Sequence, residues 1–155
     1  MATTVGCRDV LKGAGKSVKR KAPDELLYPN VVVYTGPTGS GKSHHAYRDY
    51  PDALRISCAS FEDSFPFDSY DGQDTIWLEE FGAGALKYSQ LLYLFDKYPA
   101  AVKVMYKGYI PLKVTTWVIT TCTHPDDWYL GVGDRDEFLR RLKLWNVKVL
   151  EPREV

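Results

Sequence analysis

The sequence predicts a single α/β domain in which a mainly parallel β-sheet is covered by helices on both faces. Short apolar runs alternate with segments of helical periodicity, and this pattern is typical of parallel sheets buried on both sides. A glycine-rich turn separates the first apolar run from the first helical segment. The length of 155 residues fits one domain, because domains usually contain about 100 to 200 residues.

The individual elements follow from these runs in chain order. The run Val31 to Tyr34 is β-branched and predicts the first strand. The further strands are expected at Ala53 to Ser57, Thr75 to Leu78, Val102 to Tyr106, Thr115 to Thr121 and Leu144 to Leu150. Helical periodicity predicts helices around Ser43 to Tyr50, Tyr88 to Lys97 and Asp134 to Lys143.

The first 29 residues are expected to form a flexible basic arm, and residues 30–155 the folded domain. The arm is rich in glycine, lysine and serine and has few apolar residues. Its segment Lys16 to Pro23 reads KSVKRKAP and resembles a nuclear import signal, with a solvated charge run as the alternative. We interpret GAGKS, at Gly13 to Ser17, as a decoy, because Val10 stands where a phosphate loop needs glycine.

The net charge of zero hides an uneven distribution. Residues 1–22 carry six basic side chains and one acid, a charge of +5, so the other 133 residues carry −5. Bulk electrostatics would not hold an acidic domain on DNA, so any nucleic-acid contact in that domain requires a local basic feature.

The sequence predicts a soluble intracellular protein with no membrane partner. The three cysteines are odd in number and far apart, which favours a reducing compartment over a disulfide framework or a metal site. No apolar run approaches the roughly 20 residues that cross a bilayer, and the N-terminus lacks the apolar core of a secretory signal.

The glycine-rich turn has the pattern of a phosphate-binding loop. Residues Gly36 to Ser43 read GPTGSGKS and satisfy G-x-x-x-x-G-K-[ST] between a predicted strand and a predicted helix. Backbone N–H groups must converge on phosphate oxygens there, and glycines remove side chains that would collide with them. A chance glycine-rich turn is the alternative. The predicted cofactors are ATP and Mg²⁺, and the predicted nucleotide-binding residues are Gly36, Pro37, Thr38, Gly39, Ser40, Gly41, Lys42 and Ser43.

Two acids complete the predicted site. Lys42 is expected to contact the β- and γ-phosphates, and Ser43 to coordinate Mg²⁺. The strand that ends in Glu79 and Glu80 places both carboxylates at the carboxyl edge of the sheet, beside the loop. We expect Glu79 to contact Mg²⁺ through its water shell, and Glu80 to orient the attacking water and accept its proton. Two acids that merely close a strand at the surface are the alternative.

From Gly36 onward the chain resembles the superfamily-three helicase domain of replication initiator (Rep) proteins of circular single-stranded DNA viruses, especially circovirus-like ones. The resemblance extends to Trp145 and rests on five blocks in order. They read GPTGSGKS, FDSYDGQDTIWLEEF, FDKYPAAVKVMYKGYIPL, VITTCTHPDDWY and FLRRLKLW. The resemblance implies an ATP-dependent DNA helicase of the AAA+ P-loop type, which translocates on single-stranded DNA in rolling-circle replication as a ring of identical subunits, usually a hexamer. The predicted location in the host nucleus rests only on the import-like segment Lys16 to Pro23.

The resemblance also assigns roles outside the nucleotide pocket. The segment Lys103 to Pro111 looks like the hairpin that reaches into the central pore of such rings, and no acid occurs from Ala100 to Pro125. Its predicted DNA-binding residues are Lys103, Tyr106, Lys107 and Tyr109. An exposed β-hairpin with lysines guarding its edge is the alternative. Arg140 and Arg141 fall where the family places an arginine that reaches the γ-phosphate of a neighbouring subunit, and one of the pair is expected to act only within its own helix.

The sequence departs from the family pattern in three places. Cys122 stands where the family's third motif carries an asparagine that senses the γ-phosphate, so either a neighbouring threonine, Thr121 or Thr123, takes this role or hydrolysis is slow. The hairpin reads Lys107-Gly108-Tyr109 where a second glycine is usual. The nicking endonuclease motifs and a helical collar are missing, so nicking is not predicted, and the chain is a fragment, a truncated product or the partner of a separate nuclease.

Two other functions stay open. The first is a nucleotide-binding assembly module, with weak or no hydrolysis, that partners a separate nicking endonuclease. The second is a small-molecule P-loop kinase, which ranks last because such enzymes need an arginine-bearing lid and the segments between the strands contain few arginines.

Overall fold

The computed structural model describes residue 22 and residues 25–58, 66–82 and 84–152. The predicted import signal, apart from Ala22, and the GAGKS segment lie outside these residues. The elements run in the order β1 (Asn30–Thr35), α1 (Lys42–Asp49), β2 (Leu54–Ser57), β3 (Thr75–Glu79), α2 (Tyr88–Leu94), β4 (Ala101–Val104), β5 (Gly108–Pro111), β6 (Thr116–Thr121), the 3₁₀ helix η4 (Pro125–Asp127), α3 (Asp136–Leu142) and β7 (Asn146–Val149).

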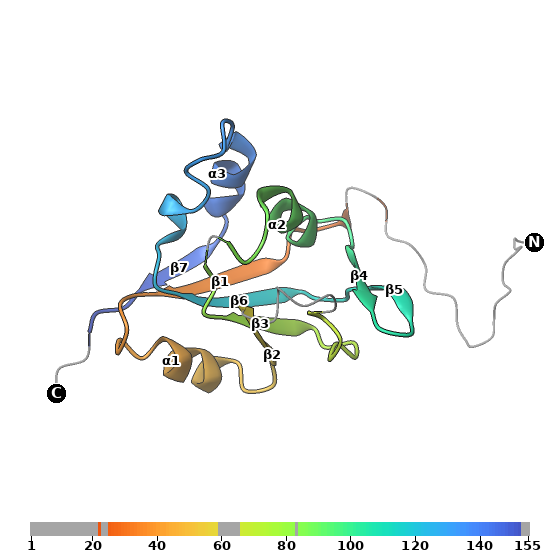
Figure 1. Cartoon of the computed structure of the whole chain (residues 1–155), viewed down its shortest axis with the longest axis horizontal. Coiled ribbons are helices and arrows are strands. Elements are labelled where there is room, and N and C mark those ends of the chain that lie inside the picture. The colour runs from red at the N-terminus through yellow and green to blue at the C-terminus, as the bar shows by residue number, and fades with distance from the viewer. Residues whose placement is uncertain (1–21, 23–24, 59–65, 83, 153–155) are drawn as a thin grey trace, which may run out of the picture.

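Five strands form one sheet in the order β2-β3-β6-β1-β7, and every neighbouring pair is parallel (Figure 1). Since the strands are parallel, the carboxyl ends of β1, β6 and β3 lie at one edge of the sheet. The antiparallel hairpin β4–β5 lies beyond the opposite end of the sheet (Figure 1). The predicted α/β fold with a mainly parallel sheet is therefore confirmed.

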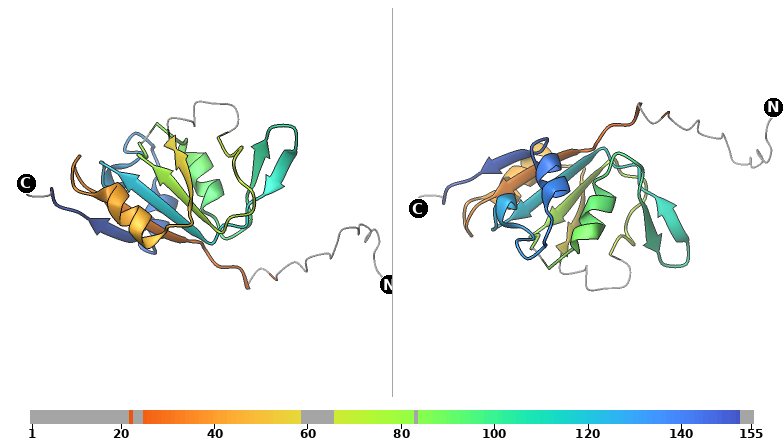
Figure 2. Two further views of the ribbon diagram at one scale, coloured as in Figure 1. Left: turned by 90° about the horizontal axis from the view of Figure 1, so that it is seen from below. Right: turned by 90° about the horizontal axis from the view of Figure 1, so that it is seen from above.

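The helices cover both faces of the sheet, with α1 on one face and α2 and α3 on the other (Figure 2). Alternate side chains of each strand point to opposite faces, which divides the core in two. On the α1 face, Ala46 packs with a small cluster that includes Val32, Tyr34, Trp77 and Val118. The other face holds the larger cluster, whose buried aromatic residues include Phe67, Phe95, Trp117, Trp128 and Phe138.

Several elements are shorter than the sequence predicts. The helix α2 stops at Leu94 rather than Lys97, because the backbone leaves the helical region at Phe95, whose φ is −101° and ψ 17°. The strand β4 stops at Val104, since the chain turns at Tyr106, whose φ is 66°. The helix α3 begins at Asp136, where the side chain of Asp134 accepts a hydrogen bond from the Asp136 N–H at 3.0 Å. Within the described residues, no helix has the length and apolar character needed to cross a lipid bilayer.

Candidate functional site

The glycine-rich loop lies between the end of β1 and the start of α1, at the carboxyl edge of the sheet. Gly39 and Gly41 have φ angles of 87° and 85°, in the left-handed region that glycine adopts without steric cost. A turn closes the loop where the Ser40 N–H donates to the Pro37 carbonyl at 3.1 Å. The sequence thus supplies glycine at the two positions where the backbone of the loop reverses.

Gly36 is required for a different reason, which is close packing. A Cβ atom at this position would lie 2.6 Å from the backbone oxygen of Leu150 and 2.8 Å from Ser40 Oγ. The first contact is with backbone, so it is not relieved by a side-chain rotation. The Ser40 hydroxyl is itself buried without a hydrogen-bond partner among the described residues. The loop therefore sits tightly against the segment that follows β7.

Lys42 is the first residue of α1, and its ammonium group folds back over the loop. Its Nζ donates to the carbonyl oxygens of Gly36 at 2.9 Å and Pro37 at 3.1 Å. Ser43 follows on the exposed first turn of α1. The loop, the lysine and the serine predicted to act together therefore lie together, and the N-terminal end of an eight-residue helix faces the loop.

The two predicted acids lie at the same edge, separated from the loop by one strand. Glu79 ends β3, and β6 lies between β3 and β1. Glu80 adopts a φ of 56°, and its N–H donates to the Thr120 hydroxyl at 3.2 Å. The next N–H, of Phe81, donates to the Thr120 carbonyl at 2.8 Å. These bonds to β6 fix the backbone turn that carries Glu80 off the end of the strand into solvent.

Arg55 is a site residue that the sequence did not reveal. It lies on β2 beside Trp77, and its guanidinium group binds both carboxylate oxygens of Glu79, one of them at 2.9 Å. The same group stacks over the Trp77 ring at 4.7 Å. Glu79 raises the pKa of Arg55, so this guanidinium remains a cation. In the sequence, Arg55 is only a polar residue between the apolar Leu54 and Ile56 of a strand. Its contact with Glu79 becomes visible only when β2 is known to pair with β3.

Cys58 lies next to these acids in the fold, directly after β2. Burial raises the pKa of its thiol to about 12, with smaller contributions from the charges of Glu79 and Glu80. The thiol therefore stays protonated at neutral pH and acts as a small apolar group.

Cys122 follows β6, between the loop and the acids, and is exposed. The preceding residue, Thr121, forms hydrogen bonds with backbone groups of two neighbouring segments. Its carbonyl accepts the Gly36 N–H at 3.3 Å, and its hydroxyl donates to the Phe81 carbonyl at 2.7 Å. Thr121 thus links the glycine-rich loop to the residues that follow β3. Because the Thr121 hydroxyl is already bonded, Cys122 and Thr123 are the side chains after β6 that can face a ligand.

The structure separates the roles of the two predicted arginines. Arg141 has a side chain only 9% exposed and donates to Glu137 and to the Leu92 carbonyl, each at 2.7 Å. Its guanidinium also lies 5.3 Å from the Tyr28 ring. Arg140 is 58% exposed and pairs with Glu137 at 2.6 Å. The described contacts of Arg141 therefore all lie within its own domain, and Arg140 presents the more exposed guanidinium of the pair. Contact of one of them with a neighbouring subunit stays a prediction.

Replacing Arg141 by alanine is expected to destabilise the fold by about 1 to 3 kcal/mol, because a buried hydrogen-bonded cation is removed from Glu137 and α2. The midpoint of urea unfolding measures this. Arg140→Ala is the matched control and should change the midpoint much less, since its hydrogen bonds to Glu137 and to the Tyr28 hydroxyl are exposed to solvent. Equal losses in both variants would contradict the assignment.

The predicted DNA-binding residues form the exposed part of the hairpin and lie far from the loop, beyond the other end of the sheet (Figure 1). Lys103 pairs with Tyr109 across the two strands. Tyr106 is 99% exposed at the tip, Tyr109 is 71% exposed, and Lys107 is also exposed. The expected hairpin is therefore present, with aromatic rings and lysines facing solvent.

The chain is similar to replication proteins of viruses and of a bacterium. It is 35% identical over 100 residues to the replication-associated protein of canary circovirus, a match that covers 64% of this chain and 32% of that protein. The corresponding protein of pigeon circovirus is 34% identical over 100 residues, covering 64% of this chain and 29% of that protein. A replication protein of Onion yellows phytoplasma (strain OY-M) is 31% identical over 113 residues, covering 72% and 30%.

The chain thus spans about a third of the length of the curated relatives it matches. No family model matches it. A solved structure of the NrS-1 C-terminal region aligns with a TM-score of 0.49 and 14% identity over 81% of this chain and 29% of that chain, which is too distant to support a functional inference. The sequence relatives support a role in replication.

Proposed function

We propose that this chain is an ATP-hydrolysing motor domain of the AAA+ P-loop type, and that it moves on single-stranded DNA during replication. One observation carries the proposal: a complete phosphate loop and two acids meet at one edge of a parallel sheet, with only β6 between them. The similarity to circovirus replication-associated proteins supports the same assignment.

The residues present fit ATP and Mg²⁺. Gly39 and Gly41 give the loop left-handed turns without side chains, and Lys42 supplies a cation within the loop. Among the described residues no group of three or more His, Cys, Asp or Glu side chains could hold a metal ion by itself. Mg²⁺ suits such a site, because it usually binds through one or two protein oxygens together with substrate phosphates. Ser43 and Glu79 would supply those oxygens, Glu79 through the water shell.

The hydrolytic step then depends on a few side chains. Lys42 binds the β- and γ-phosphates, and Mg²⁺ offsets their negative charge when bound. Glu80 orients a water molecule and accepts its proton, and its backbone is held for this by Thr120. Arg140 would act in trans in a ring of identical subunits, where it would stabilise charge on the transferring phosphoryl group.

The hairpin is the proposed contact for single-stranded DNA. Lys103 and Lys107 would bind phosphates without reading the base sequence, and Tyr106 and Tyr109 would stack on bases. Such stacking contributes about 1 to 3 kcal/mol per base. The exposed rings at the tip and on β5 support this assignment.

The direct test is a steady-state ATPase assay with and without a short single-stranded oligonucleotide. We expect Mg²⁺-dependent turnover that rises when the DNA is added and stops when EDTA removes the metal. A turnover rate that does not change with DNA, together with phosphate transfer to a nucleoside, would instead support a small-molecule kinase.

Arg55 gives a further prediction for the metal site. The Arg55 guanidinium group holds the Glu79 carboxylate, so Arg55→Ala should free that acid to bind the metal. The Mg²⁺ concentration needed for ATP binding should then fall by about two- to fivefold, the change in affinity that corresponds to the free energy of an exposed ion pair. A Mg²⁺ titration with a fluorescent ATP analogue measures this. Arg48→Ala is the control, because Arg48 pairs with Asp49 on α1, away from the acids. An increased Mg²⁺ requirement in Arg55→Ala would show that the pair positions Glu79 instead of competing for it.

Cys122 favours a second candidate, a nucleotide-binding assembly module with little hydrolysis that partners a separate nicking endonuclease. A thiol is a weak hydrogen-bond partner, and Thr121 beside it is already bound to Phe81. If the thiol limits turnover, Cys122→Asn should raise kcat about five- to tenfold, the value of one added hydrogen bond in the transition state. The parent protein would then bind ATP with negligible turnover. An unchanged kcat would remove the basis of this second candidate.

A further inference from the structure

Residues 66–74, which we call the linker, precede β3 and contact both ends of the hairpin. The carboxylate of Asp68 accepts a hydrogen bond from the Met105 N–H at 2.7 Å, at the hairpin tip. The Tyr70 hydroxyl accepts one from the Lys113 N–H at 2.8 Å, just after β5. These pairs are 37 and 43 residues apart in sequence, so the contacts exist only in the folded chain.

The linker is itself anchored in the core. Phe67 and Tyr70 are buried, and the Phe67 ring meets the Trp117 ring of β6 at 6.5 Å in an edge-to-face contact. At the end of the linker, the Asp74 carbonyl accepts the N–H groups of Thr115 at 2.8 Å and Thr116 at 3.2 Å. The linker therefore joins the hairpin to the starts of two neighbouring strands, β3 and β6.

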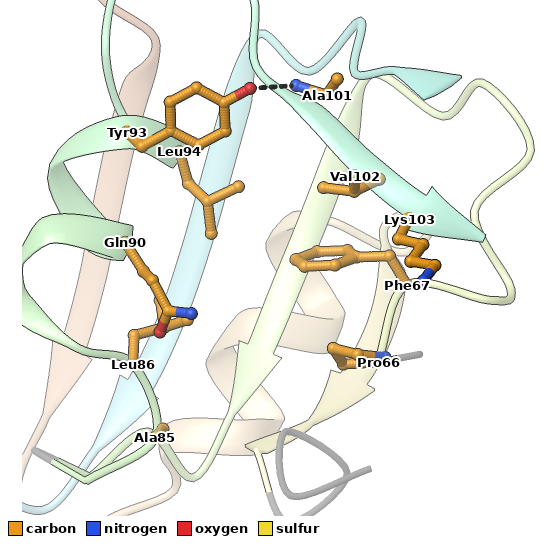
Figure 3. Close-up of a pocket in the computed structure, with 10 residues that line it drawn as sticks. All are labelled: Pro66, Phe67, Ala85, Leu86, Gln90, Tyr93, Leu94, Ala101, Val102 and Lys103. Carbon is orange, nitrogen blue, oxygen red and sulfur yellow. Dashed lines mark hydrogen bonds between the residues drawn. The ribbon is translucent and has the colours of Figure 1, made fainter. Parts of the chain in front are cut away.

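The hairpin also packs on the domain through Val102 and Val104, which belong to the larger core cluster. The described residues leave a cavity of about 310 Å³ between β4, α2 and the start of the linker (Figure 3). Its lining includes Phe67, Leu86, Gln90, Leu94 and Val102. Across it, Tyr93 of α2 accepts the Ala101 N–H through its hydroxyl at 2.9 Å (Figure 3). Because the cavity leaves part of this side without close packing, the polar contacts of Asp68, Tyr70 and Tyr93 add to the apolar contacts of Val102 and Val104 in holding the hairpin.

The strand β3 connects the linker with the acids. It runs from Thr75, directly after the linker, to Glu79, and Glu80 follows. A movement of the hairpin that pulls on Asp68 and Tyr70 therefore acts on one end of the strand whose other end carries both acids. Packed strands and hydrogen-bond networks of this kind transmit coupling between sites.

We propose that Asp68 and Tyr70 are positioning residues that couple a DNA strand on the hairpin to the acids at the end of β3. The proposal rests on the proposed function, because it assumes that the hairpin binds single-stranded DNA. DNA bound at the hairpin would regulate the nucleotide site through the linker, even though the two sites lie at opposite ends of the sheet.

Hydrogen–deuterium exchange of the full chain, with and without oligo-dT, tests this without requiring turnover. In the parent protein, oligo-dT should slow exchange both in residues 101–113 and in residues 75–81. In Asp68→Ala without DNA, the exchange rate of the Met105 amide should rise about 2- to 12-fold, which corresponds to the free energy of one lost hydrogen bond. Oligo-dT should still protect the hairpin of this variant but no longer change residues 75–81.

Three variants separate positioning from other effects. Asp68→Asn keeps an acceptor for the Met105 N–H and should behave as the parent protein, whereas a purely electrostatic role of the Asp68 charge would make it behave as Asp68→Ala. Tyr70→Phe removes only the acceptor for Lys113 and should also uncouple residues 75–81. Asp71→Ala, an exposed acid of the same linker, is the control and should leave the coupling intact.

The outcomes distinguish the two proposals. A parent protein in which oligo-dT changes no exchange rate would overturn both the DNA-binding function and the coupling. A parent protein that responds in both segments, together with Asp68→Ala and Tyr70→Phe variants that respond identically, would overturn the coupling alone.

Discussion

Replacing Lys42 by alanine is expected to abolish ATP hydrolysis and to weaken ATP binding by about 10- to 150-fold. The ammonium group lies within the loop, bound to the carbonyls of Gly36 and Pro37. A hydrogen bond between a charged donor and an anion contributes about 1.5 to 3 kcal/mol, and each 1.4 kcal/mol corresponds to about a tenfold change in affinity. Equilibrium titration with a fluorescent ATP analogue measures the binding term separately from turnover.

The fold should survive this substitution. The Lys42 side chain bonds to two loop carbonyls and lies outside both core clusters, so the urea midpoint should change little. Lys143→Ala is the matched control, since Lys143 is an exposed lysine at the end of α3. If Lys42→Ala bound ATP like the parent protein, the loop would not be a nucleotide site and the proposed function would be wrong.

Glu80→Gln is expected to lower kcat by about 100-fold or more, because a general base contributes about 10² to 10⁴ to the rate. ATP binding should persist, since glutamine keeps the size of the side chain and the backbone at this position is held by Thr120. A single-turnover experiment with radiolabelled ATP would show a bound nucleotide that is not cleaved.

Two further variants test whether Glu79 binds the metal and Glu80 acts as the general base. Glu79→Gln should raise the Mg²⁺ requirement more than it lowers the maximal rate, because Glu79 is assigned to the metal. Glu151→Gln, an exposed acid beyond β7, should change neither. Full turnover in Glu80→Gln combined with its loss in Glu79→Gln would mean that the two acids have exchanged roles.

Local chemistry explains why the loop was predictable. Gly39 and Gly41 occupy left-handed backbone, and a turn of this kind at the end of a β-branched run needs no distant partner to be recognised. The steric need for Gly36 was not predictable in the same way, because it arises from Leu150, which lies more than a hundred residues later in the sequence.

The two arginines show the opposite case. Arg140 and Arg141 are adjacent and chemically identical, so the sequence left open which of them acts only within its own helix. Both arginines contact Glu137 and Tyr28, but α3 turns only Arg141 toward the Leu92 carbonyl of α2 and buries its side chain, while that of Arg140 is 58% exposed. Burial is a property of neighbouring elements, and a single helix does not encode it.

The sequence by itself determined the alternation of strands and helices, the glycine-rich loop between the first strand and the first helix, and the acids at the end of a strand, since each depends on residues close together in the chain. Only the tertiary structure revealed the Arg55–Glu79 pair, the structural role of Arg141 and the contacts of Asp68 and Tyr70 with the hairpin. These depend on strand pairing and packing between segments tens of residues apart, where the hydrophobic pattern sets which face is buried but not which side chains meet across it.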